Sequence, residues 1–278
     1  MTSDRATTIA SSSPYILGRS AAEHERLALQ AARLTPGTAA LLDRVGVAAG
    51  ASCLDVGCGT GAVMDLLAQR TGRAGRIVGI DLDRELGRHT EARLHAAGHR
   101  QCRIVGGDVM SASFAGHERF DLVFGRLVLI HADDPVALLR RMWELTAPGG
   151  VLVVEDYVLH AIASEPPTWL FEEFRRVVGG VFEEHRRPLD AGLRLPRWFS
   201  EAGIGAPQGT TVTGAVETVG EIRWQLEGVY RSTLPLALES GLTTPSDSEA
   251  WLAELSVTDP DHTAFGPIMI GAYARRTR

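Results

Sequence analysis

The fold is constrained most strongly by residues 54–61, LDVGCGTG, in which an apolar run ends in an acid and three alternating glycines follow. Apolar side chains then recur at helical spacing over residues 62–67. This order predicts a buried strand, a tight glycine turn and a helix start, which lets the backbone approach a bound ligand closely. The glycines also fit a relaxed dinucleotide fingerprint. A carboxylate at Asp55 is unfavourable beside a pyrophosphate and suits a ligand that carries an ammonium or sulfonium group.

Residues 54–61 closely resemble motif I of the class I S-adenosylmethionine-dependent methyltransferases. The resemblance implies S-adenosyl-L-methionine as the cofactor and places Asp55, Gly57, Cys58, Gly59 and Gly61 against it. It also implies an α/β, Rossmann-like fold. The expected sheet has seven strands, mostly parallel with an antiparallel last strand, and it carries N-terminal helices and an inserted helical cover.

Acids also end the next two predicted strands. Residues 77–81, IVGID, end at Asp81, and residues 102–109, CRIVGGDV, contain Asp108 near their end. Because ligands bind outside the carboxyl ends of parallel strands, these acids and the one in the glycine motif predict a shared site. An acid at the tip of the second strand can accept two hydrogen bonds from ribose hydroxyls. Asp83 is the rival acid, and it is also suited to cap the following helix.

The resemblance assigns further roles around the adenosine. It gives the ribose role to Asp81 and packs Leu82 on the adenine ring. It also implies that Asp108, beside Gly107, accepts from the adenine amino group and that the backbone N–H of Val109 binds a ring nitrogen. The alternative for Asp108 taken alone is an Asx-turn within its loop.

The remaining chain continues the alternation of strands and helices. Residues 120–131 predict a fourth strand that runs into a loop, and Asp133-Asp134-Pro135 predicts a helix start, with the helix ending near Thr146. After a Pro-Gly-Gly turn, residues 151–157 predict a fifth strand buried on both faces. Beyond it we expect helices near 166–187, 195–203, 216–239 and 246–256, and an antiparallel pair of strands at 205–216 and 267–274.

The N-terminal part is expected to cover the core. Ser20 and Glu23 form a capping box, which predicts a helix that ends at Thr35-Pro36-Gly37 and is followed by a second one over 38–47. Tyr15 is expected to reach over the cofactor or to pack before the helix. The predicted organisation is a disordered tail (1–13), a helical cover (14–50), the cofactor-binding core (51–157), and substrate-covering helices with the final strands of the same domain (158–278).

Composition excludes several classes of function. The net charge is −6 and no basic stripe is present, so we expect no nucleic-acid partner. No apolar stretch approaches the roughly 20 residues that span a bilayer, and no apolar signal segment opens the chain, so we expect a cytoplasmic protein without a membrane partner. Cys53, Cys58 and Cys102 have no metal-ligand spacing, and no metal site is expected. The sequence leaves open whether the protein forms a homo-oligomer.

Candidate catalytic residues follow the fourth and fifth strands. Methyl transfer from a sulfonium requires positioning and water exclusion, and a base helps when the acceptor must lose a proton. His131 is best placed, and titration near neutrality would suit proton removal; the alternative is a histidine that fixes its loop. Tyr157 and His160 are the other candidates. Arg126 is expected beside the cofactor, where it either binds an acidic group of the substrate or pairs with a nearby acid.

The nature of the acceptor is only coarsely indicated. The sequence after the fourth strand, RLVL at 126–129, differs from the Asn/Asp-Pro-Pro-aromatic loop of nucleic-acid base methylators. The hypothesis is methyl transfer to a small molecule in bacterial natural-product biosynthesis, with O-transfer favoured over N- or C-transfer. The rivals are an NAD-type oxidoreductase and a non-catalytic protein that binds S-adenosylmethionine. Aromatic residues expected either in the core or along a flat, greasy pocket are Trp169, Phe171, Phe174, Phe182, Trp224 and Tyr230.

Overall fold

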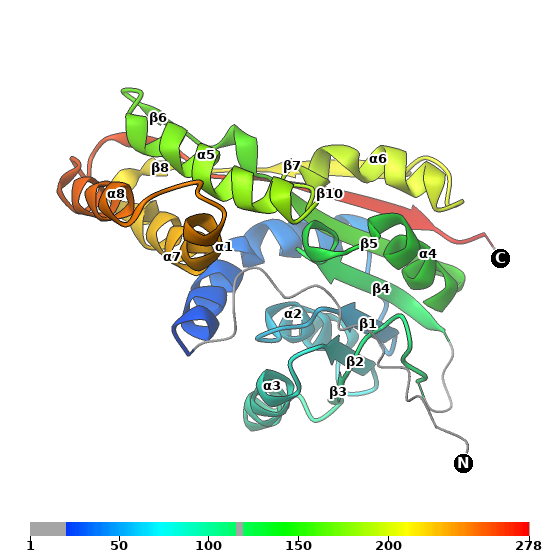
Figure 1. Ribbon diagram of the computed structural model, residues 1–278. Helices are drawn as coiled ribbons and strands as arrows, with labels where there is room; N and C mark the ends of the chain where they lie inside the picture. Colours follow the sequence, from blue (N-terminus) through cyan, green and yellow to red (C-terminus); the bar gives the residue numbers. More distant parts are fainter. Residues whose placement is uncertain (1–20, 115–118, 278) are drawn as a thin grey trace, which may run out of the picture.

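The computed structural model describes residues 21–114 and 119–277. One sheet of seven strands organises it (Figure 1). The strand order is β3 (Cys102–Gly106), β2 (Arg76–Asp81), β1 (Ser52–Val56), β4 (Phe120–Arg126), β5 (Thr146–Val158), β10 (Ile268–Arg275) and β7 (Gly209–Thr213). β10 runs antiparallel to both β5 and β7, while the other pairs are parallel. The predicted mostly parallel sheet with an antiparallel last strand is therefore confirmed.

Hydrophobic cores lie on both faces of the sheet, because successive strand residues point to opposite sides. Cys53 of β1 belongs to the core that includes α1 (Ala21–Val45) and α2 (Ala62–Thr71). Its neighbour Leu54 belongs to the core that includes α4 (Pro135–Leu145) and α6 (Ala191–Glu201). α3 (Arg84–Ala96) packs on β3 and β2. This alternation explains why the central strands read as continuous apolar runs.

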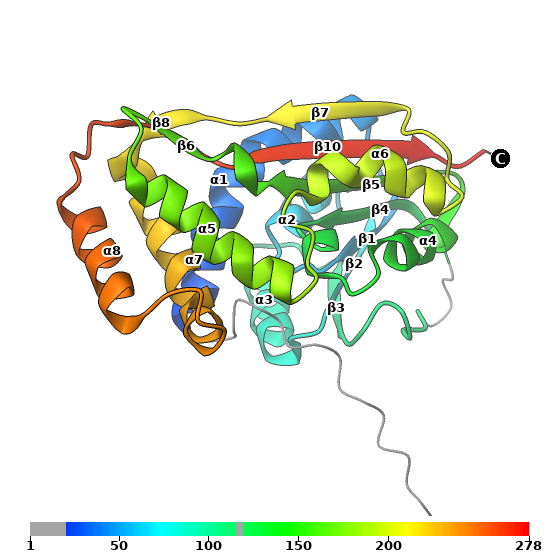
Figure 2. The ribbon, with the colours of Figure 1, turned by 45° about the horizontal axis from the view of Figure 1, so that its top comes forward.

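A helical cover lies beyond the carboxyl ends of the parallel strands. It contains α5 (Trp169–Glu184), α7 (Val219–Glu239) and α8 (Pro245–Val257), and the arrow of the antiparallel strand β10 points away from it in Figure 2. α5 packs against α7 and α8. The helices predicted after the fifth strand are thus present as α5 to α8. A small antiparallel sheet that the sequence did not predict completes the cover, in the order β6 (Ala163–Glu165), β9 (Thr263–Phe265) and β8 (Val216–Thr218).

The two helices predicted before β1 are one helix. The predicted break at Thr35-Pro36-Gly37 is wrong, because Pro36 lies inside α1. Thr35 Oγ1 donates to the carbonyl oxygen of Ala31 at 2.8 Å. Gly37 packs so closely on β7 that an added Cβ would lie 2.8 Å from Thr213 Cγ2. Packing on the sheet therefore compensates for the backbone hydrogen bond that proline cannot donate, and the helix continues past Pro36. Ser20 of the predicted capping box lies outside the described residues.

Two other boundaries differ from the predicted ones. The Pro-Gly-Gly turn expected after the fourth-strand helix belongs to β5, which begins directly after α4. The reason is pairing with the end of the chain: Gly149 N–H donates to Arg276 O, and Arg276 N–H donates to Gly150 O, both at 2.8 Å. The single strand expected at 205–216 is divided into β7, in the large sheet, and the start of β8, in the small one.

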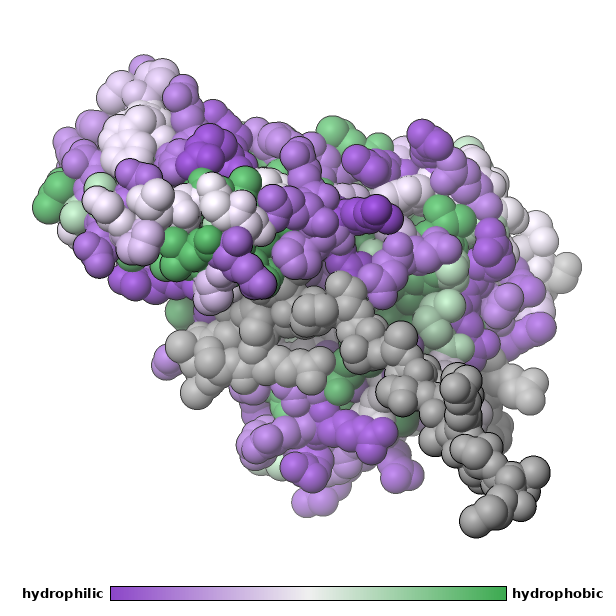
Figure 3. Space-filling view, in the orientation of Figure 1, coloured by the Kyte–Doolittle hydropathy of each residue, from purple (hydrophilic) through white to green (hydrophobic). Residues whose placement is uncertain are grey.

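The described surface in Figure 3 is mainly hydrophilic, with hydrophobic residues in small separate groups. Among the helices at 21–114 and 119–277, none combines the length and the apolar character needed to cross a membrane. Within the same ranges, no group of three or more His, Cys, Asp or Glu side chains is arranged to hold a metal ion.

Candidate active site

The glycine turn after β1 is fastened to β2. The N–H groups of Gly57 and Cys58 both donate to the carbonyl oxygen of Ile80, at 2.8 and 3.2 Å. The Cys58 side chain is buried, and an added Cβ at Gly79 of β2 would lie 2.7 Å from its sulfur. Burial raises the pKa of the Cys58 thiol well above its ordinary value, so the thiol stays protonated. Cys58 therefore shapes the turn and does not present a reactive side chain to a ligand.

Gly59 leaves open space at the tip of this turn. Its φ is +47°, in the left-handed region that favours glycine. An added Cβ at Gly57 would lie 2.4 Å from Val128, and one at Gly61 would lie 2.6 Å from Thr90. An added Cβ at Gly59 would meet no atom within 4 Å. Two of the glycines are therefore required by the packing of the protein itself, and the third leaves room for a ligand.

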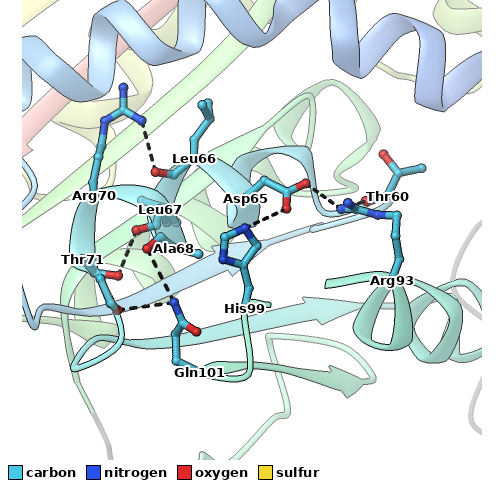
Figure 4. Close-up of polar contacts among 11 residues, drawn as sticks. Thr60, Asp65, Leu66, Leu67, Ala68, Arg70, Thr71, Arg93, His99 and Gln101 are labelled. Atoms are coloured by element: carbon cyan, nitrogen blue, oxygen red, sulfur yellow. Dashed lines mark hydrogen bonds and ion pairs between the residues drawn. The ribbon is translucent and has the colours of Figure 1, made fainter. Parts of the chain in front are cut away.

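α3 braces the turn from the other side. Arg93 donates to the carbonyl oxygen of Thr60 at 3.0 Å and to Asp65 Oδ2 at 2.7 Å. Figure 4 shows Arg93 reaching from α3 to both residues, while His99 approaches the second oxygen of Asp65. The turn is thus held rigidly before any ligand binds, which reduces the entropy lost on binding.

The acid at the tip of β2 takes the predicted position. Asp81 Oδ2 accepts from the backbone N–H of Gly59 at 2.8 Å, and Oδ1 accepts from the N–H of Asp83 at 2.9 Å. The Asp83 side chain instead caps α3 by accepting two N–H groups of its first turn. Leu82, between the two acids, is 58% exposed. The structure therefore separates a carboxylate at the glycine turn from a helix cap, and it leaves an apolar side chain at the open edge.

The third acid lies at the end of β3. Asp108 Oδ1 accepts from the N–H of Met110 at 2.9 Å, which is the Asx-turn considered as the alternative. An added Cβ at Gly107 would meet no atom within 4 Å. Val109 is buried, whereas Met110 is 47% exposed and lies at the same sheet edge as Leu82. The adenine contacts of Asp108 and Val109 stay predictions.

Asp55 is the most unusual group at this edge. Its side chain is buried, and Oδ2 has no hydrogen-bond partner among the described residues. Burial raises its pKa to about 7 and Asp81 adds to the rise, whereas Arg126 opposes it. A buried carboxylate oxygen without a partner is costly, so it indicates a missing ligand group. The space above Gly59 and this oxygen together fit S-adenosylmethionine, which carries an ammonium and a sulfonium.

Arg126 belongs to a buried polar network behind Asp55. It donates to Thr38 Oγ1 at 3.0 Å, and Thr38 donates to Glu155 Oε2 at 2.6 Å. Burial lowers the pKa of Arg126, whereas Glu155 and Asp55 raise it. The network joins α1, β4 and β5. Arg126 thus reaches Glu155 through Thr38, and both roles considered for Arg126 stay predictions.

A narrow cavity lies beyond the ends of β4 and β5, between α1, α5 and α7. Its volume is about 50 Å³, and part of it is open to solvent. Its polar wall is formed by Arg26, Gln30, His131, Tyr157 and Gln225. The described apolar side chains that line it are Leu127, Ile130, Leu159, Ile162, Phe174, Phe182, Ile222, Leu226, Val229 and Pro267. Two of the aromatic residues considered as pocket candidates are among them.

His131 is placed in this cavity by a turn of 3₁₀-helix, Leu129–His131. Asp156, at the end of β5, accepts the N–H groups of Leu129 and Ile130 at 3.0 and 3.1 Å, and so fixes the turn. The imidazole is 6.2 Å from the ring of Phe182, measured between centroids. No local sequence pattern indicates this role of Asp156, because it depends on contacts between residues far apart in the chain.

The environment of His131 keeps its imidazole neutral. Burial lowers its pKa to about 3, and the positive charges of Arg187 and Arg26 contribute to the same effect. The titration near neutrality expected from the sequence is therefore wrong for this cavity. A base with so low a pKa is a weak proton acceptor, so His131 is better suited to hydrogen bonding than to proton removal.

The other two candidates occupy different environments. Tyr157 faces the cavity, and its hydroxyl oxygen accepts from Gln30 Nε2 at 3.2 Å. Burial raises its pKa, so the phenol stays protonated. His160 lies outside the cavity lining, with a half-exposed side chain and Nδ1 2.6 Å from Asp190 Oδ2. The structure thus brings His131 and Tyr157 together and leaves His160 apart; Tyr15 lies outside the described residues.

Comparison with known proteins identifies the class. An open α/β sheet with a glycine turn and acids at the carboxyl ends of its strands is typical of cofactor-binding proteins. Residues 53–150 match the family profile described as a methyltransferase domain. The trans-aconitate 2-methyltransferase of Deinococcus radiodurans is 35% identical over 185 residues, which cover 63% of this chain and 67% of that protein. The 2-phytyl-1,4-naphtoquinone methyltransferase of Thermosynechococcus vestitus is 34% identical over 127 residues, which cover 46% of this chain and about half (52%) of that relative.

Solved structures share the fold. A putative methyltransferase from Bacillus halodurans superimposes with a TM-score of 0.58 and 20% identity, over 86% of this chain and 99% of that one. The phosphoethanolamine N-methyltransferase 2 of Haemonchus contortus, in complex with S-adenosyl-L-methionine, gives 0.51 and 18%, over 86% of this chain and 51% of that one. This chain belongs to the class I S-adenosylmethionine-dependent methyltransferases. The predicted family, enzyme class and cofactor are confirmed.

Proposed function

We propose that this protein transfers the methyl group of S-adenosylmethionine to a small, largely apolar acceptor bound in the cavity under α1, α5 and α7. The observation that carries this proposal is the place of the cavity. Leu127 and Ile130 line it, and Val128 between them is the side chain on which Gly57 of the glycine turn packs. The acceptor and the cofactor would therefore meet at the end of β4.

The cavity has a polar anchor inside an apolar wall. Gln225 of α7 is buried, and its Oε1 has no hydrogen-bond partner among the described residues. Leaving such a group unpaired costs roughly 1–3 kcal/mol, which an acceptor with a suitably placed donor would recover. Leu127, at the end of β4, has a φ of +57°, which is strained for a leucine. Strain of this kind occurs preferentially at functional sites.

The chain's own residues would act by binding, orienting and excluding water. S-adenosylmethionine supplies an electrophilic methyl group on a sulfonium, transferred by in-line displacement. Asp55, Gly59, Asp81 and Asp108 are the residues that we propose to hold this cofactor. The apolar side chains of the cavity would keep water away from the transferred methyl group, and the neutral imidazole of His131 would orient the acceptor by a hydrogen bond.

The finer parts of the proposal have separate support. Transfer to oxygen is favoured over nitrogen or carbon because the cavity presents hydrogen-bonding groups and no carboxylate among its described lining residues, as a bound ammonium would need. The relatives named above act on a naphthoquinone and on an organic acid, according to their names. A Gly-, Ala- and Arg-rich composition and the helical cover support a place in bacterial natural-product metabolism, in the cytoplasm.

The test is a screen of small acceptors with methyl-labelled cofactor, read out as label transfer and as S-adenosylhomocysteine formation. Calorimetric titration of S-adenosylmethionine and of NAD runs in parallel. We expect the first ligand to bind, the second not to bind, and product to form with suitable acceptors. The Gly59→Val variant is the matched blank, because it removes the space for the cofactor. Binding without turnover on any acceptor would instead support a non-catalytic binding protein.

A further inference from the structure

The charges around the acceptor cavity are strongly one-sided. Among the described lining residues, Arg26 is the only one that carries a full charge at neutral pH, and none is an aspartate or glutamate. Its side chain is almost completely buried, and it crosses α7 so closely that an added Cβ at Gly228 would lie 2.6 Å from Arg26 Cδ. The guanidinium is therefore held in place by helix packing at the cavity wall.

The pKa values of His131 and Tyr157 reflect the same positive potential. Arg26 and Arg187 both disfavour a proton on His131, in addition to the effect of burial. Arg126, Arg26 and Arg33 all favour the anionic form of Tyr157, although burial outweighs them and keeps the pKa raised. Among the described residues, Asp133 pairs with Arg187, Glu217 pairs with Arg33, and Glu155 accepts from Thr38. A potential that disfavours an imidazolium also disfavours an ammonium, and it stabilises an anion.

Hydrogen bonds direct this potential into the cavity. Arg26 donates to Gln30 Oε1, and Gln30 Nε2 donates to the hydroxyl oxygen of Tyr157 at 3.2 Å. Because the phenol oxygen already accepts the amide proton, its own O–H proton is left to donate. Hydrogen bonds arranged in series strengthen one another. The chain from Arg26 thus ends in a polarised O–H at the cavity wall.

We propose that the acceptor binds in this cavity as an organic anion, a phenolate, enolate or carboxylate on an apolar body, with its negative charge held by Arg26 and the hydroxyl of Tyr157. This proposal deepens the proposed function and rests on it. An acceptor that arrives as an anion has no proton left to lose, so the cavity needs no general base. That agrees with an imidazole at His131 that stays neutral.

The experiment compares three probes of similar shape that differ in charge. Binding of 2-naphthoate, 2-naphthamide and 2-naphthylmethylammonium to the full chain is measured by calorimetry, with and without S-adenosylhomocysteine. We expect naphthoate to bind best and the ammonium worst. Arg26→Gln should lower the affinity for naphthoate roughly 10- to 100-fold and leave the affinity for the amide nearly unchanged, since a charge-assisted hydrogen bond is lost.

Control variants separate the charge from the fold. Arg231→Gln removes an arginine of α7 that pairs with Glu227 on the surface, and it should leave all three affinities unchanged. Arg26→Lys keeps the charge and should retain part of the preference even if Arg26→Gln does not fold. The ranking of the probes on the unaltered chain needs no variant at all. Equal or tighter binding of the ammonium, or no binding of naphthoate at millimolar concentration, would overturn the proposal.

The results that would reject the proposed function differ from those that would reject the anionic acceptor. If S-adenosylhomocysteine does not bind, or no acceptor is methylated, methyl transfer is rejected while the preference for an anion is still measured. If instead amines are methylated and the ammonium probe is preferred, methyl transfer stands and the anionic acceptor is rejected.

Discussion

The carboxylate of Asp81 accepts a hydrogen bond from the backbone N–H of Gly59 at 2.8 Å, between residues 22 positions apart in the chain. This contact joins the tip of β2 to the one glycine of the turn that has open space above it. The acid proposed to bind the ribose therefore also fixes the backbone that the cofactor would approach. A substitution at this position acts on both.

We expect Asp81→Ala to weaken binding of S-adenosylhomocysteine by about 1.5–3 kcal/mol, the usual value of hydrogen bonds to a charged group. Asp81→Asn is expected to lose less, because its amide oxygen can still accept from Gly59. Asp83→Ala is the control: it removes the cap of α3 and should reduce the melting temperature with little effect on affinity. Calorimetric titration of all three variants checks this, and unchanged affinity in Asp81→Ala would reject the ribose role.

Gly59→Ala is expected to abolish cofactor binding in a protein that still folds. The added Cβ meets no protein atom within 4 Å, so the clash would be with the ligand alone. The positive φ costs roughly 1–2 kcal/mol of stability. Gly46→Ala is a matched control, because Gly46 also has a positive φ and equally free space but lies far from the site, after α1. Both variants should lose similar stability in thermal unfolding, and only Gly59→Ala should lose binding.

Asp55 should make the unliganded protein less stable as pH rises. Its pKa is raised from 3.8 to about 7, so the folded protein binds this proton more tightly than the unfolded chain does. The stabilising contribution is complete below the unfolded pKa and is lost as pH rises through about 7. Asp55→Asn removes the buried charge and should raise the free energy of unfolding at pH 8 by up to about 4 kcal/mol, with little change at pH 4.

Denaturant titrations at several pH values measure this effect. Asp156, whose pKa is also raised to about 7, will leave a residual slope in the Asp55→Asn variant. The same variant should bind S-adenosylmethionine poorly, since the unpartnered oxygen that suits a cationic ligand is lost. A variant whose stability is lower than that of the parent at pH 8 would contradict the assignment of a desolvated carboxylate.

The pH dependence of methyl transfer should follow the acceptor and not His131. With cofactor saturating, kcat/KM should rise through the pKa of the acceptor and show no limb near the usual histidine pKa, because the pKa of His131 is lowered to about 3. The His131→Gln variant should keep the rise at the pKa of the acceptor, and its kcat should fall less than about 10-fold. Loss of a true general base costs about 10²–10⁴-fold. His160→Ala is the control outside the cavity. A limb that stays fixed when acceptors of different pKa are compared would show that a protein group titrates instead.

The cofactor edge was largely predictable because its signals are local. A strand, a turn that needs positive φ and an acid lie within a few residues of one another around Asp55, and the same holds at Asp81. Helix starts at Asp83 and Asp134 were also readable, since an N-cap depends on side chains next to the helix. The alternation of strands and helices also predicts a mostly parallel sheet, but it does not determine the order of the strands.

The acceptor cavity was not predictable in the same way. Arg26 and Gln30 lie in α1 and Gln225 lies in α7, in helices where an arginine or glutamine ordinarily faces solvent, and only the packing of α1 against α7 buries these side chains. The behaviour of His131 had the same origin, because residue type sets an ordinary pKa and tertiary burial changed it. The uninterrupted α1 likewise depends on Gly37 meeting Thr213, a contact that no local pattern contains.

Pro36 divides α1 into two functional halves. Arg26 and Gln30 line the cavity on one side of it, while Thr38, Leu41 and Leu42 are buried against the sheet on the other. Since proline supplies no backbone N–H to the helix, bending costs least at this point. A bend of α1 at Pro36 would therefore move Arg26 and Gln30 together, while Thr38, Leu41 and Leu42 stay packed on the sheet.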